Sequence, residues 1–178
     1  FTMGAQFAYW RDYERRRLPG LLLKWHVVMP ALTRVFGYFP GRRLDWLEDT
    51  PRGVVRDWTA RHPRFEDTWR RGSLVLPEDE RRALVERFAD VRAATLALSV
   101  GDDEFGTVAA VERLLAYYRG SARTHLHMAP VDVGLREIGH FAFFHSRFEH
   151  TLWKLPLEWL RFGRLAPDSP GRVIGAAA

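Results

Sequence analysis

Apolar and polar residues follow two different periods along the second half of the chain. The run Thr95–Val100 is mostly apolar, and 124–128 alternates apolar and polar positions, so both segments are predicted to be strands. Apolar residues recur with helical spacing over 108–118, which ends before Gly120, and over 148–162. A helix, strand, helix, strand, helix order of this kind predicts an α/β fold with a parallel sheet.

Short helical segments separated by proline and glycine fill about the first 75 residues. An amphipathic, arginine-rich helix is expected after residue 8, followed by a helix over 21–35 that Pro30 kinks or divides. Thr50 is predicted to cap a further helix that has Pro51 in its first position. These helices are typical of an insertion that packs over another part of a protein.

Two further segments complete this outline. Residues 1–7 are short, apolar and glycine-containing, which predicts the end of a strand or the loop after it. Glu78, Asp79 and Glu80 predict the first turn of a helix, because the helix dipole favours negative charge there. Its inward stripe is expected to consist of Leu84, Val85 and Phe88.

Composition limits the class of protein. A chain of 178 residues with 47% apolar content is long enough to bury one sizeable core. The sequence has no cysteine, which excludes disulfides, cysteine-ligated zinc, iron–sulfur centres and thiol catalysis. This composition suits a reducing compartment, so a cytoplasmic location is expected.

The net charge of +5 comes almost entirely from arginine, since Lys24 and Lys154 are the only lysines. Such a charge suits an anionic substrate, a nucleic acid or a membrane surface, but no nucleic-acid-binding motif accompanies it, so no nucleic-acid partner is expected. The apolar stretch 21–39 is interrupted by Lys24, Pro30 and Arg34, which argues against an integral membrane span. The first residues lack the pattern of a signal peptide and do not begin with methionine, so the chain is expected to be processed, excised or incomplete.

Carboxylates directly follow the predicted strand Thr95–Val100, and a histidine lies later in a glycine-initiated turn. Asp102, Asp103 and Glu104 would stand at the carboxyl edge of a parallel sheet, where sites in this fold class lie. An aspartate there and His140 are two thirds of a Ser-His-Asp triad, in the Asp-before-His order of α/β-hydrolases. The alternative is that Asp102 or Asp103 only caps the helix that begins near Thr107.

His140 is followed by the apolar residues 141–144, which would hold its imidazole firmly at the tip of a loop. A general base needs this kind of support, although a buried histidine that satisfies a backbone group would give the same pattern. His125 and His127 alternate on a predicted strand and could ligate a metal, but the spacing of the other histidines does not add a ligand. No metal and no cofactor is expected.

Four strings also carry a resemblance to a known family. They are Tyr-Trp-Arg-Asp at 9–12, the segment 30–44 with Phe-Gly-Tyr-Phe-Pro-Gly, the strand end 96–104, and 129–141 with Ile-Gly-His-Phe. Together they resemble predicted bacterial α/β-hydrolases related to the serine aminopeptidase and monoacylglycerol lipase-like group. The resemblance covers about 1–162 and implies the C-terminal part of an α/β-hydrolase fold with an inserted helical cap. It implies four parts: a strand end at 1–8, the cap at 9–76, the core at 77–165 and a tail at 166–178.

The same resemblance implies roles for individual residues. It places the base at His140 and the acid in the pair Asp102 and Asp103. Asp103 is favoured, because Thr107 then occupies the position where many relatives have proline, and Asp102 stays an alternative. The cap would shape an apolar pocket for a small acyl substrate, with substrate-binding residues Trp10, Phe36, Tyr38 and Phe39.

One part of the family pattern is absent from this sequence. A complete member has a Gly-x-Ser-x-Gly nucleophile elbow, and none of the serines stands in such a string: Ser73, Ser99, Ser121, Ser146 and Ser169. Two interpretations follow. The chain is part of a serine hydrolase that cleaves esters, amides or thioesters, with its nucleophile in a missing N-terminal half. Alternatively it is a truncated, inactive remnant that binds an acidic partner or a lipid surface, in which case an open sheet edge would favour a homo-oligomer.

Overall fold

A computed structural model describes residues 1–60, 62–70 and 75–175. The chain divides into two compact units: Phe1–Phe7 with Arg87–Ala178, here called the sheet unit, and Ala8–Glu86, here called the helical unit. The expected helical cap, 9–76, ends ten positions before the helical unit does. Within the described residues, no helix combines the length and the apolar character that a bilayer span requires.

The sheet unit contains a four-stranded sheet in the order β1-β4-β5-β6. The strands are β1 (Thr2–Met3), β4 (Thr95–Val100), β5 (Arg123–Met128) and β6 (Arg172–Ile174). The first three are parallel, as the sequence predicts, but β6 runs antiparallel to β5. The expectation of a parallel sheet is therefore wrong for β6, which lies in the segment expected to be a tail, and the sheet is mixed.

The register of β4 and β5 decides where their following loops begin. Thr95 pairs with Arg123 and Val100 pairs with Met128, so the two strands start and end together. Gly101 continues the ladder by donating its N–H to the Met128 carbonyl at 2.8 Å. The loops after β4 and β5 therefore leave the sheet side by side at its carboxyl edge.

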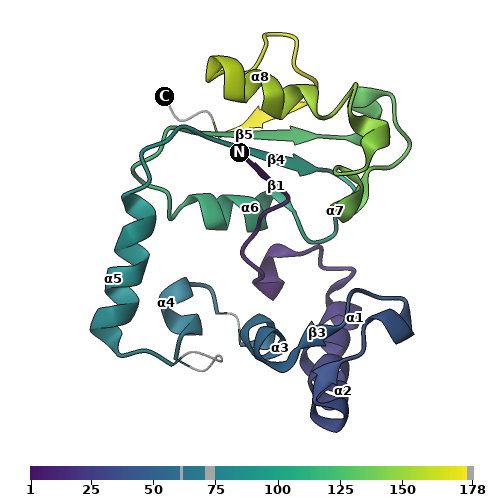
Figure 1. Cartoon of the computed structure of the whole chain (residues 1–178), viewed down its shortest axis with the longest axis vertical. Helices are drawn as coiled ribbons and strands as arrows, with labels where there is room; N and C mark the ends of the chain where they lie inside the picture. Colours follow the sequence, from purple (N-terminus) through teal and green to yellow (C-terminus); the bar gives the residue numbers. More distant parts are fainter. Residues whose placement is uncertain (61, 71–74, 176–178) are drawn as a thin grey trace. The chain divides into compact units, whose positions relative to one another are not determined.

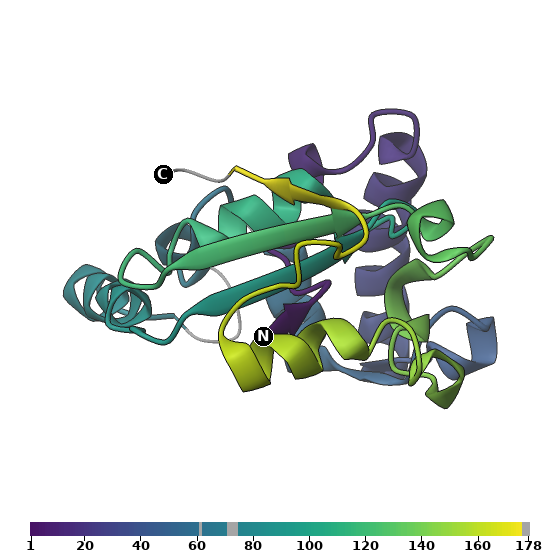
Figure 2. The same ribbon diagram turned by 90° about the horizontal axis from the view of Figure 1, so that it is seen from above.

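The two faces of the sheet differ in character. One face forms the main apolar core with α8 (Lys154–Phe162), through buried residues that include Leu98, Leu126 and Trp159. The opposite face carries α6 (Val108–Leu115), where Ala97 packs against Val111 and Leu115. Figures 1 and 2 show α8 and α6 on opposite sides of the sheet.

Caps and prolines set the ends of the helices in the sheet unit. Thr107 caps α6, because its Oγ1 accepts the Ala110 N–H at 3.2 Å. The predicted helix over 148–162 begins six residues later than expected. Pro156 then lies in the first turn of α8, where a proline without an N–H is tolerated, instead of in the helix interior.

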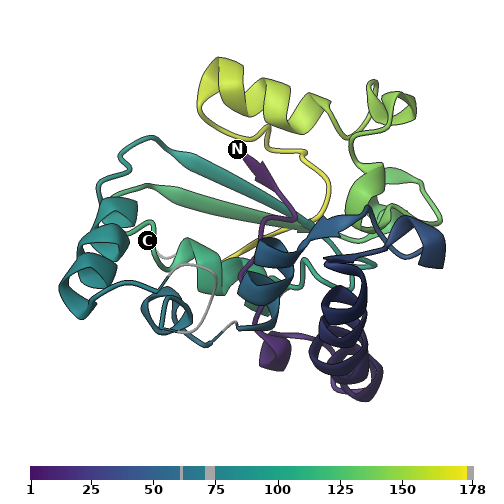
Figure 3. The same cartoon turned by 60° about the horizontal axis from the view of Figure 1, so that its bottom comes forward.

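A long helical segment dominates the first part of the helical unit. It consists of α1 (Leu18–Leu23), the π-helical turn η2 (Lys24–Val28) and α2 (Met29–Phe36), which follow one another along one column in Figure 3. Pro30 lies in the first turn of α2, so it divides the helix as predicted. Gly37 ends the segment with a φ of 79°, a conformation that glycine adopts without steric cost.

The arginine-rich segment before α1 is not the helix that the sequence predicts. It contains only the short 3₁₀ turn η1 (Trp10–Asp12), and α1 begins at Leu18. Pro19 suits this start, because it lies in the first turn of α1, where a missing N–H is tolerated, whereas it would interrupt a helix that continued from the preceding segment. The helical prediction for this segment is therefore wrong.

The predicted cap at Thr50 is also wrong. Thr50 and Pro51 form β3 (Thr50–Pro51), which pairs with β2 (Tyr38–Phe39), and the Thr50 hydroxyl donates to the Glu48 carbonyl at 2.8 Å. Helix α3 (Arg52–Thr59) therefore begins one residue later, after Pro51.

The short elements η3 (Arg42–Leu44) and α4 (Phe65–Thr68) also belong to the helical unit, as does most of the longer helix α5 (Glu78–Ala89). Helix α5 has its three acidic residues in the first turn, as predicted. One buried apolar cluster of the helical unit contains Met29, Phe39 and Val55.

Candidate functional site

Two loops meet at the carboxyl edge of the sheet. The chain turns directly after β4, where the Asp103 N–H donates to the Val100 carbonyl at 3.2 Å. After β5 it passes through the 3₁₀ turn η4 (Pro130–Val133) and reaches the short helix α7 (Gly139–Ala142), which carries His140. The parallel register thus brings together residues that are 37 positions apart.

Asp103 and His140 form a hydrogen-bonded pair. Nδ1 of His140 lies 2.8 Å from Oδ2 of Asp103. The side chain of Asp103 has no exposed surface, whereas that of His140 is 27% exposed. A carboxylate can only accept, so Nδ1 carries the proton and the lone pair of a neutral imidazole is on Nε2. Within the described ranges, no residue hydrogen-bonds to Nε2.

The loop after β4 also holds the Asp103 carboxylate in place. Its other oxygen, Oδ1, accepts the backbone N–H groups of Phe105 and Gly106, both at 2.9 Å. Burial raises the pKa of Asp103, but the hydrogen bonds from His140, Gly106 and Phe105 and the attraction of His140 outweigh burial. The pKa of Asp103 therefore lies below its ordinary value, and the group is a carboxylate at neutral pH.

Asp102 has a different role from its neighbour. Its Oδ2 accepts the N–H of Ile138 at 2.7 Å and the N–H of Gly139 at 3.0 Å. These are the two residues directly before His140, and Gly139 has a φ of 68°. Asp103 thus contacts the imidazole, while Asp102 fixes the backbone that carries it.

Gly106 and Gly4 have no side chain at positions where one would crowd Asp103 and His140. A Cβ atom on Gly106 would lie 2.3 Å from Oδ2 of Asp103, closer than any real contact. A Cβ atom on Gly4, which follows β1 with a φ of 58°, would lie 3.2 Å from the same oxygen and 3.6 Å from the His140 ring. The loop after β1 therefore forms part of the wall around Asp103 and His140.

Two aromatic rings lie against the imidazole. The ring of Phe105 meets it edge to face with the centroids 5.5 Å apart, and the ring of Phe141 does so at 4.6 Å. Phe141 is 70% exposed. His140 thus contacts two apolar rings and a carboxylate, and its Nε2 has no hydrogen-bond partner among the described residues.

No described serine is placed to be activated by His140. Ser99 is fully buried and hydrogen-bonds to two other histidines, and Ser121 is buried and bonded to Thr95 and to the Ala93 carbonyl. Ser73 lies outside the described residues. Among the described serines, none hydrogen-bonds to His140.

A second polar cluster lies under α6 and was missed by the sequence reasoning. Nδ1 of His125 lies 2.6 Å from Glu112 Oε1, and its Nε2 lies 2.7 Å from the Ser99 hydroxyl. The same hydroxyl lies 2.9 Å from Nδ1 of His127. Because Glu112 can only accept, a neutral His125 donates from Nδ1 and accepts from Ser99, which then accepts from His127. The cross-strand pairing of Ser99 with His127 is the signal that could have revealed this cluster.

Glu112, His125 and Ser99 are connected in the order of a catalytic triad, but a substrate has no access to them. The side chain of His125 is 1% exposed and Ser99 is fully buried, so a substrate could not reach the hydroxyl. Burial lowers the pKa of His127, and the electrostatic effects of Arg172 and His125 lower it further against the opposing effect of Asp132. The cluster therefore acts as a buried polar network that joins β4, β5 and α6.

The described residues contain no group of three or more histidine, aspartate or glutamate side chains placed to hold a metal ion. His125 and His127, which alternate on β5 as predicted, each have one ring nitrogen within hydrogen-bond distance of the Ser99 hydroxyl.

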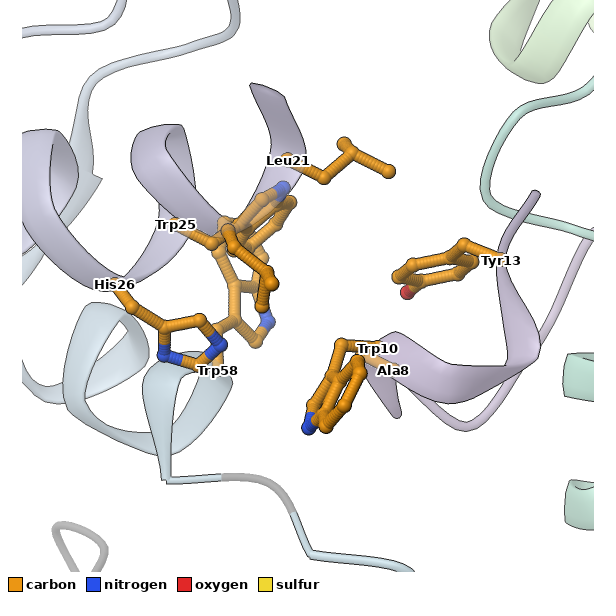
Figure 4. Close-up of a pocket in the computed structure, with 8 residues that line it drawn as sticks. Ala8, Trp10, Tyr13, Leu21, Trp25, His26 and Trp58 are labelled. Carbon is orange, nitrogen blue, oxygen red and sulfur yellow. The ribbon is translucent and has the colours of Figure 1, made fainter. Parts of the chain in front are cut away.

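The predicted substrate-binding aromatics do not gather in one place. Trp10 lines a hollow in the helical unit, but Phe39 is fully buried in that unit's core, Phe36 is 47% exposed and Tyr38 is half-buried on β2. Figure 4 shows Trp10 and Tyr13 facing Trp25, His26 and Trp58 across this hollow. Of the four predicted residues, Trp10 is thus the one that lines it.

Comparison of the chain with protein-family models, with curated proteins and with solved structures gives no match. The function therefore has to be inferred from the chemistry that the residues at the carboxyl edge of the sheet can perform.

Proposed function

We propose that this chain carries the acid and the base of a serine hydrolase of the α/β-hydrolase type. Such an enzyme would cleave a small acyl compound, an ester, an amide or a thioester, by acyl transfer. The observation that carries the proposal is the hydrogen bond between buried Asp103 and partly exposed His140 at the carboxyl edge of the sheet. This is the acid–base geometry that a Ser-His-Asp triad requires.

In the proposed mechanism, Nε2 of His140 takes the proton from a serine hydroxyl as that oxygen attacks the acyl carbon. The Asp103 carboxylate stabilises the imidazolium that forms, and holds Nδ1 as the donor. His140 then gives the proton to the leaving group, and a water molecule repeats both steps to release the acid. No cofactor takes part in these steps.

The nucleophile in this proposal is a serine on a segment that precedes Phe1 in the natural protein. The buried Ser99 and Ser121 do not suit the role, because both hydroxyls are already bonded within the sheet unit. The resemblance to bacterial α/β-hydrolases supports the same division, with residues 9–76 as a cap. The cytoplasm is the proposed location, since the sequence has no cysteine.

The alternative function is a non-catalytic binding module. It is favoured by one observation: none of the described serines hydrogen-bonds to His140. In that case the surplus arginines would bind an acidic partner or a lipid surface.

Hydrolysis by the natural protein, with any upstream sequence included, tests the proposal. We expect it to hydrolyse short-chain 4-nitrophenyl esters, and we expect His140→Ala to lower kcat by several orders of magnitude with little change in Tm. His150→Ala is the matched control, because this histidine is exposed. Equal activity of the His140 and His150 variants would refute the role of His140, and absence of hydrolysis by the unmodified protein would favour the binding module.

A further inference from the structure

Phe141 directly follows the proposed base and lies against it. Its ring meets the His140 imidazole edge to face, with the centroids 4.6 Å apart and the planes at 74°. Phe141 is nevertheless 70% exposed, so the described residues leave most of its apolar surface uncovered. The neighbouring Phe144 is 60% exposed, but its ring packs on Phe143 and has no such relation to His140.

Phe141 lies within reach of the free nitrogen of the imidazole. Nδ1 faces Asp103, whose side chain has no exposed surface, so a reacting group meets His140 at Nε2. Because the centroids of the Phe141 and His140 rings are 4.6 Å apart, a molecule bound at Nε2 comes within reach of Phe141.

The chemistry of the proposed reaction decides which part of the substrate lies next to Phe141. After attack, the bond between the acyl carbon and the leaving oxygen or sulfur breaks, and the proton on Nε2 moves to that atom. The leaving atom must therefore lie within about 3 Å of Nε2. The groups attached to it then fall within van der Waals reach of the Phe141 ring, whereas the acyl group is positioned by the nucleophile.

We infer that Phe141 is a specificity-determining contact for the leaving group, and that the substrates are acyl esters or thioesters of an apolar alcohol or thiol. This inference rests on the proposed function. An apolar leaving group covers the exposed ring and removes its surface from water, whereas a hydroxylated or charged one would lose hydration there. Phe141 thus selects substrates by the alcohol or thiol that leaves, and not by their acyl group.

Two acetate esters of nearly the same shape test this inference. Cyclohexylmethyl acetate and (tetrahydropyran-4-yl)methyl acetate differ by one remote ring atom, CH₂ against O, so the acyl group is the same and the leaving alcohols have similar basicity. We expect the natural protein to hydrolyse cyclohexylmethyl acetate with a kcat/KM roughly fivefold higher than that for the tetrahydropyran ester. Phe141→Ala should bring this ratio close to one, Phe141→Leu should keep most of it, and Phe144→Ala should leave it unchanged.

The outcomes distinguish failure of the Phe141 contact from failure of the proposed hydrolase function. If Phe141→Ala keeps the wild-type ratio, or if the unmodified protein shows no preference, the leaving-group contact is wrong while hydrolysis through His140 stands. If the unmodified protein hydrolyses neither ester nor any 4-nitrophenyl ester, the proposed function itself is wrong. Phe141→Gln covers the case in which the alanine variant is poorly folded, because it keeps a long side chain at the same position and should also bring the ratio close to one.

Discussion

Nδ1 of His140 lies 2.8 Å from Oδ2 of Asp103, and the adjacent Asp102 bonds to the backbone just before His140. Two consecutive aspartates after one strand thus hold one histidine in two ways. Asp103 sets the tautomer of the imidazole, and Asp102 sets the position of the loop. This division of roles leads to distinct expectations for the two carboxylates.

Asp103→Asn should lower kcat of the natural protein by roughly four orders of magnitude, because an asparagine can donate to Nδ1 and favour the wrong tautomer. The fold should persist, since the amide oxygen can still accept from Phe105 and Gly106. Nitrogen chemical shifts of His140 should show protonated Nδ1 in the unmodified protein and a changed tautomer in the variant. An unchanged tautomer would show that Asp103 does not orient the imidazole.

Substitutions of Asp102 should lower activity less than substitution of Asp103. Asp102→Asn keeps an oxygen that can accept from Ile138 and Gly139, so kcat should fall less than about tenfold. Asp102→Ala removes both bonds and should cost roughly 10- to 100-fold through a displaced His140. If Asp102→Asn lost more activity than Asp103→Asn, the assignment of the two roles would be reversed.

Gly106→Ala should damage the site through crowding. The added Cβ would lie 2.3 Å from Oδ2 of Asp103, so the carboxylate or the loop has to shift. We expect a lower Tm and a loss of activity comparable to that of Asp103→Asn. Gly20→Ala is the matched control, because nothing lies within 4 Å of its Cβ and it is helical, so this variant should be as stable or up to about 1 kcal/mol more stable.

The buried network under α6 should contribute to stability. Ser99→Ala leaves Nε2 of His125 and Nδ1 of His127 without their shared partner, which should cost roughly 1–3 kcal/mol of unfolding free energy. Ser169→Ala makes the same chemical change at a buried hydroxyl that bonds to no described residue, and should change stability by less than about 0.5 kcal/mol. Denaturant unfolding of the two variants gives the comparison, and equal effects would mean that the network adds nothing.

Stability should fall on acidification in two ranges. The pKa of His127 is lowered from its usual 6.5, so the unfolded chain binds the proton more readily and stability declines as the pH falls below about 6.5. The pKa of Asp103 is lowered from its usual 3.8, so its contribution is present above that value and is lost as the pH falls through the folded-state pKa. His127→Gln should weaken the first decline, and His150→Gln should not. The urea midpoint between pH 7 and pH 5 measures this difference.

The sequence predicted the elements whose signals are local. The apolar run of β4 has the predicted bounds, and the three acids begin α5 as the helix dipole requires. Pro30 divides the long helix at the expected place. At these positions the residue pattern and the packed structure favour the same conformation.

The remaining features depend on contacts between distant segments. Strand β6 is only three residues long and is defined by its pairing with β5, so no period in the sequence marks it. The carboxylate that reaches His140 depends on the turn after Val100, and both aspartates satisfy the sequence pattern equally. The bonds of Ser99 to His125 and His127 span 26 and 28 positions and follow only from strand register.

The central claim is that Asp103 and His140 activate a serine for acyl transfer. Labelling of the natural protein with a fluorophosphonate, followed by mass mapping of the modified residue, tests it most directly, since the probe reacts with an activated serine. We expect one labelled serine in sequence upstream of Phe1, with labelling lost in His140→Ala and retained in His150→Ala. Absence of labelling, or labelling that persists in His140→Ala, would contradict the claim.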